Sequence, residues 1–229
     1  MISPSILELP NLTTLDLSGN DFNQNHIPEF ICSLSNLKHL DFSLANLSGS
    51  FPHQLGNLSH LQYLYIHTND LKINENLEWL SHLSSLEYLD LSHTNLSAAN
   101  DWLEVVSHLP NLTSLHLWSC DLPPMSFLSL SRFNYSKSFT SLESLVLGFN
   151  RLNGGIPKFL GDICTLRKLN LAHNNLNGQL VDIIDNLSGC AKDSLEILGL
   201  PSNQISGLWP NNFGIIFPLP KEINLQQTI

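Results

Sequence analysis

The sequence carries little charge, and most of that charge is negative. Only 13% of the 229 residues are charged, and 20 acidic residues against 10 basic ones give a formal net charge of −10. Phosphate backbones and anionic membrane surfaces repel such a chain, so nucleic acid is not expected as a partner. No run of 18 apolar residues occurs, so we expect no membrane span or insertion. Residues 1–10 also lack the basic start and long apolar stretch of a secretory signal peptide.

Motifs for catalysis and for metal binding are missing as well. The sequence has no GxSxG nucleophile turn, no glycine-rich phosphate loop and no HExxH pair. Its four cysteines show no CxxC or other metal-ligand spacing. Asp16, Asp41 and Asp90 recur within LDLS-type blocks, which indicates a solvated repeat position rather than the paired carboxylates of a hydrolase. We therefore expect no enzyme activity, no cofactor and no metal ion.

Three residue types are abundant, because 47 Leu, 28 Ser and 25 Asn fill 100 of the 229 positions. The bias comes from an internal repeat of LxxLxLxxN blocks, 24 to 30 residues apart, which is the period of a leucine-rich repeat. The fourth residues of these blocks are Leu15, Leu40, Leu64, Leu89, Leu115, Leu145, Leu169, Leu198 and Ile223. We therefore predict an α/β leucine-rich-repeat solenoid over residues 1–229, about eight to nine turns long, with a concave parallel β-sheet.

The ninth position of each block should connect neighbouring turns. It holds Asn20, Ala45, Asn69, Thr94, Cys120, Asn150, Asn174, Asn203 and Thr228. An Asn amide at this position can bond the backbone of adjacent turns and so form a ladder along the solenoid. Ala45 has no polar side-chain group, so we predict an interruption of the ladder at the second strand.

The sequence segments that follow the strands are of two kinds. Several turns follow the pattern xLxGxIPxxLGxLxx, as in LNGGIPKFLGDICTLRKL from Leu152 and LSGSFPHQLGNLSHLQYL from Leu47. This pattern resembles the plant-specific subclass of leucine-rich repeats, which implies short extra strands and 3₁₀ turns on the convex side. Two other segments, NENLEWLSHLSSLEYL and NDWLEVVSHLPNLTSL, have apolar residues at three- and four-residue intervals, which predict a true helix in each. The same spacing favours core packing for Trp79 and Trp102 over a binding role.

Both ends of the sequence fall inside a repeat. ISPSILELPNL reads as the back half of a turn, and KEINLQQTI supplies a strand without a back half. Terminal repeats normally need caps, and no Cys-paired cap is evident at either end. We therefore expect part of a longer solenoid, poorly soluble by itself and without a transmembrane or kinase domain.

Seven N-x-[ST] triplets occur, at Asn11, Asn46, Asn57, Asn95, Asn111, Asn134 and Asn186. A chain rich in Asn and Ser forms such triplets by chance. However, Asn11 and Asn111 directly precede a strand block, and Asn46 and Asn95 directly follow a ladder residue, where side chains face solvent. We therefore predict glycosylation and passage of the parent protein through the secretory pathway.

The four cysteines fall into two pairs. Cys32 and Cys120 occupy apolar or ladder positions and are expected to be small buried hydrophobes. Cys164 and Cys190 lie 26 residues apart, about one turn, so they are candidate neighbours on adjacent turns. In a secreted chain they would form a disulfide, and two free thiols are the alternative.

A closer family resemblance rests on three irregular segments: ISPSILELPNLTTLDLSGNDF, DWLEVVSHLPNLTSLHLWSCDLP and CAKDSLEILGLPSNQISG. Over nearly its whole length the chain resembles the ectodomains of plant leucine-rich-repeat receptor-like proteins, particularly the group of the ethylene-inducing xylanase receptor. The resemblance implies a parent protein on the extracellular face of the plasma membrane, with a signal peptide, one membrane span and a short tail without a kinase. It also implies signalling through kinase-bearing co-receptors.

The concave sheet is the candidate binding surface, because its outward strand positions vary while the inward Leu positions do not. Strands about 4.8 Å apart would gather one aromatic and His group: Tyr63, Tyr65, His67, Tyr88, His93, His116 and Trp118. Exposed Tyr and Trp clusters are enriched at protein interfaces, and the alternative is cross-strand pairing that only stabilises the sheet. His39, His67, His93, His116 and His173 on this face favour a pH effect on binding over a metal site.

The leading hypothesis is a non-enzymatic recognition module that binds a protein, peptide or glycan as part of a cell-surface defence receptor. One alternative is a secreted inhibitor of pathogen cell-wall hydrolases, similar to polygalacturonase-inhibiting proteins, although those have two Cys-bonded caps. The other alternative is a truncated solenoid or decoy without a ligand of its own. A membrane span encoded downstream would indicate the receptor, and a cap followed by a stop codon would indicate the inhibitor.

Overall fold

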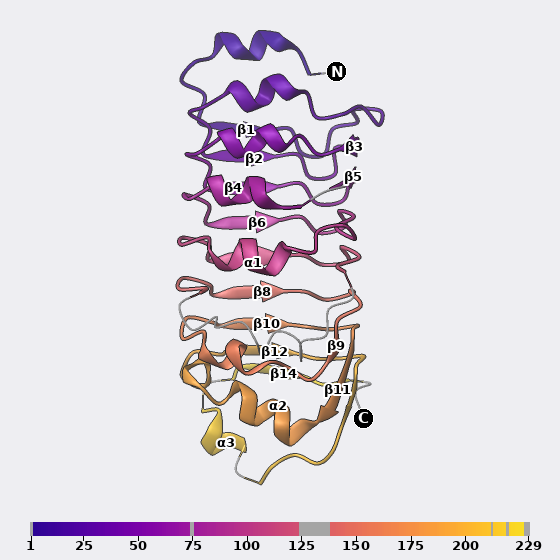
Figure 1. Ribbon diagram of the computed structural model, residues 1–229, viewed down its shortest axis with the longest axis vertical. Helices are drawn as coiled ribbons and strands as arrows, with labels where there is room; N and C mark the ends of the chain where they lie inside the picture. The colour runs from indigo at the N-terminus through magenta and orange to yellow at the C-terminus, as the bar shows by residue number, and fades with distance from the viewer. Residues whose placement is uncertain (1, 74–75, 124–137, 212, 219, 227–229) are drawn as a thin grey trace.

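The main sheet runs along the whole molecule, with its strands stacked in chain order (Figure 1). A computed structural model of the chain describes residues 2–73, 76–123, 138–211, 213–218 and 220–226. Within these residues the sheet has nine parallel strands: β1 (Thr14–Asp16), β2 (His39–Asp41), β4 (Tyr63–Tyr65), β6 (Tyr88–Asp90), β7 (Ser114–His116), β8 (Ser144–Val146), β10 (Lys168–Asn170), β12 (Ile197–Gly199) and β14 (Glu222–Asn224). We number the turns one to nine by these strands.

The repeat alignment of the sequence is also the register of the sheet. Leu15 pairs with Leu40, Leu40 with Leu64, and so on to Leu198, which pairs with Ile223. The central residue of each strand points inward, and from Leu40 to Leu115 it is fully buried. Because a one-residue slip would expose the whole row of Leu side chains, burial fixes this register. The predicted solenoid with a parallel sheet is confirmed.

The opposite side of the turns carries short helices and short strands. The 3₁₀ helices among the described residues are η1 (Pro4–Glu8), η2 (Glu29–Ser33), η3 (His53–Asn57), η4 (Glu78–His82), η6 (Lys158–Asp162) and η7 (Cys190–Asp193). Two small parallel sheets run beside them, one of β3 (Ser48–Ser50) with β5 (Asp70–Lys72), the other of β9 (Asn153–Gly154), β11 (Asn175–Gln179) and β13 (Gln204–Ser206). The extra strands and 3₁₀ helices expected of the plant-specific subclass are therefore present.

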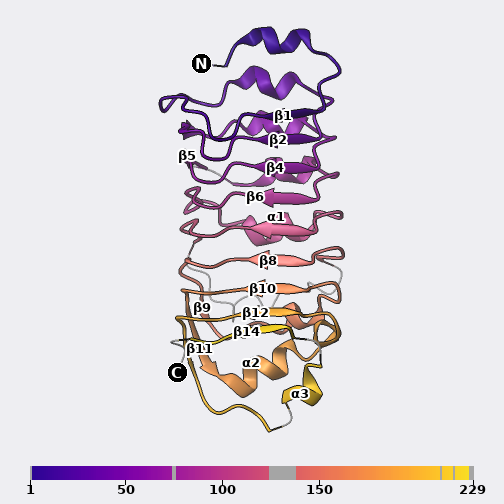
Figure 2. The same cartoon turned by 180° about the vertical axis from the view of Figure 1, so that it is seen from behind.

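Three α-helices complete this side: α1 (Trp102–Ser107), α2 (Leu180–Leu187) and α3 (Phe213–Ile216). Helix α1 lies in front of the main sheet in Figure 1 and behind it in Figure 2, which views the molecule from the other side. The concave face of the sheet is thus left without a covering layer by the elements described. None of the helices in the described residues has the length and apolar character needed to cross a membrane.

One of the two helix predictions is correct and one is wrong. Helix α1 forms as expected, but the segment around Trp79 forms only the five-residue 3₁₀ helix η4. The α-helix α2, which buries Leu180, Ile183 and Ile184, was not predicted. The helices α1 and α2 lie in repeats of 26 and 29 residues, whereas η4 and the four-residue α3 both lie in repeats of 25 residues, so repeat length alone does not decide the helix type.

The side chains assigned to the core are buried. Trp79 is 5% exposed and Trp102 is fully buried, as the spacing predicted. Cys32 and Cys120 are buried free thiols. Burial raises the pKa of the Cys32 thiol to about 11 and that of Cys120 to about 12, so neither ionises near neutral pH. All four residues therefore serve packing.

The Asn ladder is clearest at Asn150, which is buried. Its Oδ1 accepts hydrogen bonds from the backbone N–H groups of Cys120 and Leu122, both at 3.1 Å. Its Nδ2 donates to the carbonyl oxygens of Leu117 at 2.8 Å and Leu147 at 3.0 Å. One side chain thus satisfies backbone groups of two turns that water cannot reach.

The ladder is interrupted at Ala45 and Thr94, whereas at Cys120 the Sγ still donates to the Leu91 carbonyl oxygen of the previous turn at 3.2 Å. At Ala45 a backbone hydrogen bond replaces the missing side-chain bond, because the Phe22 N–H donates directly to the Ala45 carbonyl oxygen at 3.0 Å. At Thr94 the buried Oγ1 has no hydrogen-bond partner within the described residues. A Thr side chain is too short to reach both neighbouring turns as the Asn150 amide does. The interruption expected at Ala45 is confirmed, and a second one occurs at Thr94.

Candidate ligand-binding face

The fifth residue of each block decides how the chain leaves its strand. In five turns it is Asp or Asn, and its Oδ1 accepts a hydrogen bond from the backbone N–H two residues further on. The pairs are Asp16 with Ser18, Asp41 with Ser43, Asp90 with Ser92, Asn170 with Ala172 and Asn224 with Gln226, at 2.7 to 3.1 Å. Such a bond stabilises a turn locally. The recurring Asp therefore has a structural role in the repeat.

Turns three and five replace this residue with an aromatic ring. Tyr65 and His116 stand at the fifth position there, and both take part in a row of rings that crosses four strands. The ring centroids are 5.4 Å apart from His39 to Tyr65, 4.7 Å from Tyr65 to Tyr88 and 5.0 Å from Tyr88 to His116. We call His39, Tyr65, Tyr88 and His116 the aromatic stack.

Asp90 tunes the electrostatics of the aromatic stack. The Tyr88 hydroxyl lies 3.0 Å from the Nδ1 of His116, and the Asp90 Oδ2 lies 3.7 Å from the same nitrogen. Burial, the negative charge of Asp90 and nearby Tyr65 raise the pKa of Tyr88 to about 12. Burial also acts to raise the pKa of Asp90, but interactions with His116 and Ser92 outweigh it, so this pKa is lowered from its ordinary value. A carboxylate whose side chain is only 13% exposed thus stays charged beside the rings.

The other residues predicted for the patch lie at its margin. The Tyr63 hydroxyl donates to the Oε2 of Glu87 at 2.8 Å, a bond that raises the pKa of Tyr63. The Nδ1 of His67 lies 3.2 Å from the Oγ1 of Thr68. His93 is exposed, with a backbone φ of 63°. His67 and His93 share the face with the aromatic stack but show no ring contact with it in the described residues.

Trp118 belongs to a second group of rings. Its indole lies over Gly148 of the next turn, where an added Cβ would overlap the ring. The Trp118 ring is 4.8 Å from that of Phe149, and Phe149 stacks on His173 at 3.9 Å. We call Trp118, Phe149 and His173 the aromatic ledge. Phe149 is 46% exposed although its φ of 55° is unfavourable for a bulky residue, so the fold holds an apolar ring toward solvent.

Three residues of this surface were missed by sequence reasoning. His39 and His173 were placed on the concave face but not assigned to the binding patch, and Phe149, at the outward eighth position of its block, was not singled out. Their signal was available, since each is an aromatic or His residue at an outward position of its block. What the repeat pattern did not contain was the direction in which each ring leans.

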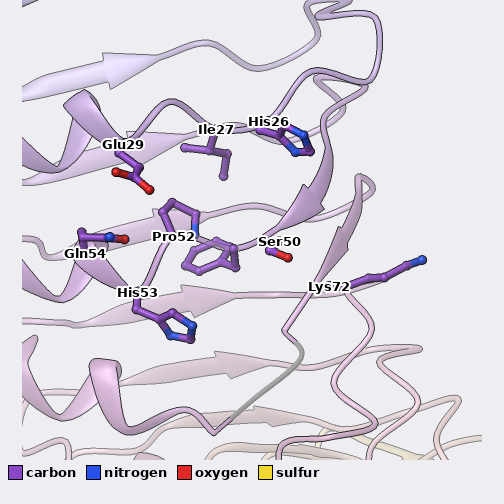
Figure 3. A pocket seen from close by; sticks show the side chains of 9 residues that line it. His26, Ile27, Glu29, Ser50, Pro52, His53, Gln54 and Lys72 are labelled. Carbon is purple, nitrogen blue, oxygen red and sulfur yellow. The ribbon is translucent and has the colours of Figure 1, made fainter.

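A hollow of about 550 Å³ lies away from the concave face, beside β3 and η3 (Figure 3). Apolar Ile27, Phe51 and Pro52 line it together with polar side chains that include His26 and Glu29. The hollow is part of the local architecture of the motif, because the His26 ring occupies the space that a side chain at position 49 would fill. In the view of Figure 3 the Lys72 side chain points away from the hollow. Its lining offers no arrangement as organised as the aromatic stack.

The remaining predicted sites lie on the edges and on the convex side. Asn11, Asn46, Asn57, Asn95 and Asn111 are exposed, and Asn134 lies outside the described residues. Asn186 is half-buried, and its Nδ2 donates to the Ile156 carbonyl oxygen at 3.0 Å. Cys164 and Cys190 are joined by a disulfide, with Cα atoms 4.8 Å apart. In the described ranges, no group of three His, Cys, Asp or Glu side chains is placed to hold a metal ion.

The parallel sheet, the Asn ladder and the convex 3₁₀ helices define the class of protein: a leucine-rich-repeat solenoid with an uncovered aromatic concave face. A family model described as leucine-rich repeat region matches residues 2–204, so the chain belongs to this family. A curated relative, Receptor-like protein EIX1 of tomato (Solanum lycopersicum), is 35% identical over 255 residues. That match covers 90% of the chain and 24% of the relative, so the chain spans about a quarter of the length of this receptor-like protein.

Solved structures of plant receptor ectodomains share the fold. One is the leucine-rich-repeat ectodomain of the receptor kinase GASSHO1/SCHENGEN3 from Arabidopsis thaliana, in complex with CASPARIAN STRIP INTEGRITY FACTOR 2. It has a TM-score of 0.73 and 30% identity, and the match covers 93% of the chain and 24% of that ectodomain chain. The ectodomain of the Arabidopsis receptor kinase HAESA, in complex with an N-terminally extended IDA peptide hormone ligand, has a TM-score of 0.75 and 29% identity. That match covers 98% of the chain and 35% of the HAESA chain. The repeats are therefore similar to those of plant cell-surface receptors.

Proposed function

We propose that the chain is a non-catalytic ligand-recognition module of a plant cell-surface receptor-like protein in defence signalling. Its concave face binds a protein, peptide or glycan, and the receptor that contains it signals through a kinase-bearing co-receptor. The observation that carries this proposal is the aromatic stack, two of whose rings, Tyr65 and His116, stand where five other turns place a structural Asp or Asn. Tyr65 and His116 give up a local stabilising bond, and departures from a repeat rule of this kind are typical of functional sites.

Two further features support a binding role for this face. The aromatic ledge adds exposed Trp and Phe rings, which are enriched at protein interfaces. Six of the seven glycosylation triplets lie in the described residues and outside the strand positions that form the face, so glycans on those six would leave it open. Glycosylation itself is part of the proposal, and a mobility shift on treatment of the secreted chain with an endoglycosidase would test it.

The test is capture of ligands by the full chain, secreted from leaf cells through an added leader peptide. The immobilised chain is exposed to fungal culture filtrate, and bound molecules are identified by mass spectrometry. One variant carries Tyr65→Ala with Trp118→Ala. A control variant carries Trp209→Ala with Ile215→Ala, which removes comparable exposed apolar side chains outside the concave sheet.

We expect the concave-face variant to lose at least 90% of a specific captured molecule, because clustered Trp and Tyr residues dominate binding energy. The control variant should capture as much as the wild type. Thermal unfolding of each variant shows whether the fold is retained. Equal capture by a folded concave-face variant and the wild type would refute the proposal.

A further inference from the structure

We propose that the concave face of turns two to five binds an extended, positively charged peptide segment. The Lys or Arg side chains of this segment reach the carboxylates of Asp41 and Asp90, which lie on either side of Tyr65. This inference rests on the proposed function and names the chemistry of its ligand.

The charge on this part of the face has one sign. The first five strand segments read TLDLSG, HLDFSL, YLYIHT, YLDLSH and SLHLWS, and they contain three Asp but no Lys or Arg. Lys38 lies outside these strand segments, one residue before β2. The charges of Asp41 and Asp90 reach Tyr65 from both neighbouring strands and, after burial, help to raise the pKa of its hydroxyl. A cationic ligand is therefore favoured on approach and an anionic one is repelled.

Asp41 and Asp90 differ in how much of each carboxylate is left open. The Oδ1 of Asp41 accepts from the Ser43 N–H at 2.7 Å, and the Oδ1 of Asp90 accepts from the Ser92 N–H at 2.9 Å. In the part of the chain that the structure describes, no donor reaches the Oδ2 of Asp41, whereas the Oδ2 of Asp90 lies 3.7 Å from the His116 Nδ1, and, despite burial, side-chain contacts with His116 and Ser92 lower the pKa of Asp90. A carboxylate accepts up to about four hydrogen bonds. Each Asp thus stabilises a turn with Oδ1; Asp41 presents its Oδ2 to a ligand, and Asp90 adds a second negative charge shared with His116.

The arrangement also sets a spacing for the ligand. Asp41 pairs across the sheet with Tyr65, and Tyr65 pairs with Asp90. The two carboxylates are therefore two strand spacings apart, or about 10 Å. A segment in the extended polyproline II conformation has three residues per turn and rises about 3.1 Å per residue, so cationic side chains three positions apart share one face and lie about 9 Å apart. The stacked rings of Tyr65 and Tyr88 lie beside the two carboxylates and add apolar contact.

A peptide fits these features better than a sugar. Tyr65 already contacts rings on both neighbouring strands, His39 and Tyr88, so its ring is largely occupied by its own neighbours. The groups left open for a ligand are carboxylate oxygens, which favour a cation. The shared axis of the stack runs across the strands, which is the direction that an extended segment would follow.

The experiment uses the full chain and three fluorescein-labelled Gly/Ser peptides of ten residues, measured by fluorescence anisotropy at two salt concentrations. The first peptide has two Arg three positions apart, and the others have Gln or Glu at those positions. The test variant is Asp41→Asn with Asp90→Asn. Asn keeps the bond to the backbone N–H, as Asn170 does in turn seven, so the variant retains its turns.

The control variant is Asp70→Asn with Asp182→Asn, two exposed carboxylates on β5 and α2 outside the concave face. Both variants change the formal net charge from −10 to −8. We expect the Arg peptide to bind wild type and control equally, and the test variant about tenfold more weakly. The Gln and Glu peptides should bind more weakly than the Arg peptide.

Two results would overturn the inference: equal losses in both variants, which would indicate bulk charge, or no preference of the wild type for the Arg peptide. If either occurs while ligand capture still depends on Tyr65 and Trp118, the proposed function stands and only the cationic ligand is refuted. If capture is independent of Tyr65 and Trp118 but the Arg peptide binds through Asp41 and Asp90, the proposed function is refuted and the cationic site stands.

Discussion

Asn150→Ala should be one of the most destabilising polar substitutions in the chain. The change leaves the buried N–H groups of Cys120 and Leu122 without their acceptor, and the carbonyls of Leu117 and Leu147 without a donor. An unsatisfied buried donor costs about 1–3 kcal/mol, so the two N–H groups alone cost about 2–6 kcal/mol. We expect the free energy of unfolding to fall by about 4 kcal/mol.

Asn20→Ala is the matched control, because it removes the same amide at the exposed end of the ladder. There Nδ2 donates only to carbonyls of its own turn, Leu17 at 3.0 Å and Ser18 at 3.4 Å. Water can replace these bonds, so the loss should be below about 1 kcal/mol. The measurement is urea unfolding followed by far-UV circular dichroism, with linear extrapolation to water. Equal losses for the two variants would refute the argument that the ladder stabilises by satisfying buried backbone groups.

Three further predictions concern single features. Gly148→Ala should push the Trp118 indole off the sheet and lower the free energy of unfolding by about 1–3 kcal/mol. The displacement should change the maximum of tryptophan fluorescence emission relative to the wild type, and an unchanged spectrum would contradict the contact. Asp90 has a folded-state pKa below its ordinary 3.8, so its stabilising effect is present above that pH and lost as the pH falls through the folded value. Asp90→Asn should therefore flatten the acid side of the stability profile, and a profile of unchanged slope would speak against the assignment. Alkylation of the denatured chain should label two cysteines before reduction and four after it, whereas four labels without reduction would show that Cys164 and Cys190 are free.

Most of the fold could be predicted from the sequence because the repeat encodes it in short-range patterns. The inward Leu at the fourth position of each block has one way to be buried, and this fixes strand, register and solenoid together. The interruption at Ala45 followed from the lack of a polar group. Helix type was less predictable. The apolar spacing around Trp79 and that around Trp102 look alike, yet the first segment forms a 3₁₀ helix and the second an α-helix.

The sequence by itself determined which residues share the concave face, since an outward position in one repeat is outward in all. Only the tertiary structure decided which of them touch. Tyr65 stacks on Tyr88, and Trp118 lies over Gly148 and against Phe149 of the next turn, where the missing Cβ leaves room for its ring. Ring direction depends on the side chains of neighbouring turns, which lie 24 to 30 residues away along the chain. No local pattern contains that information, because each side chain takes the space that its neighbours leave.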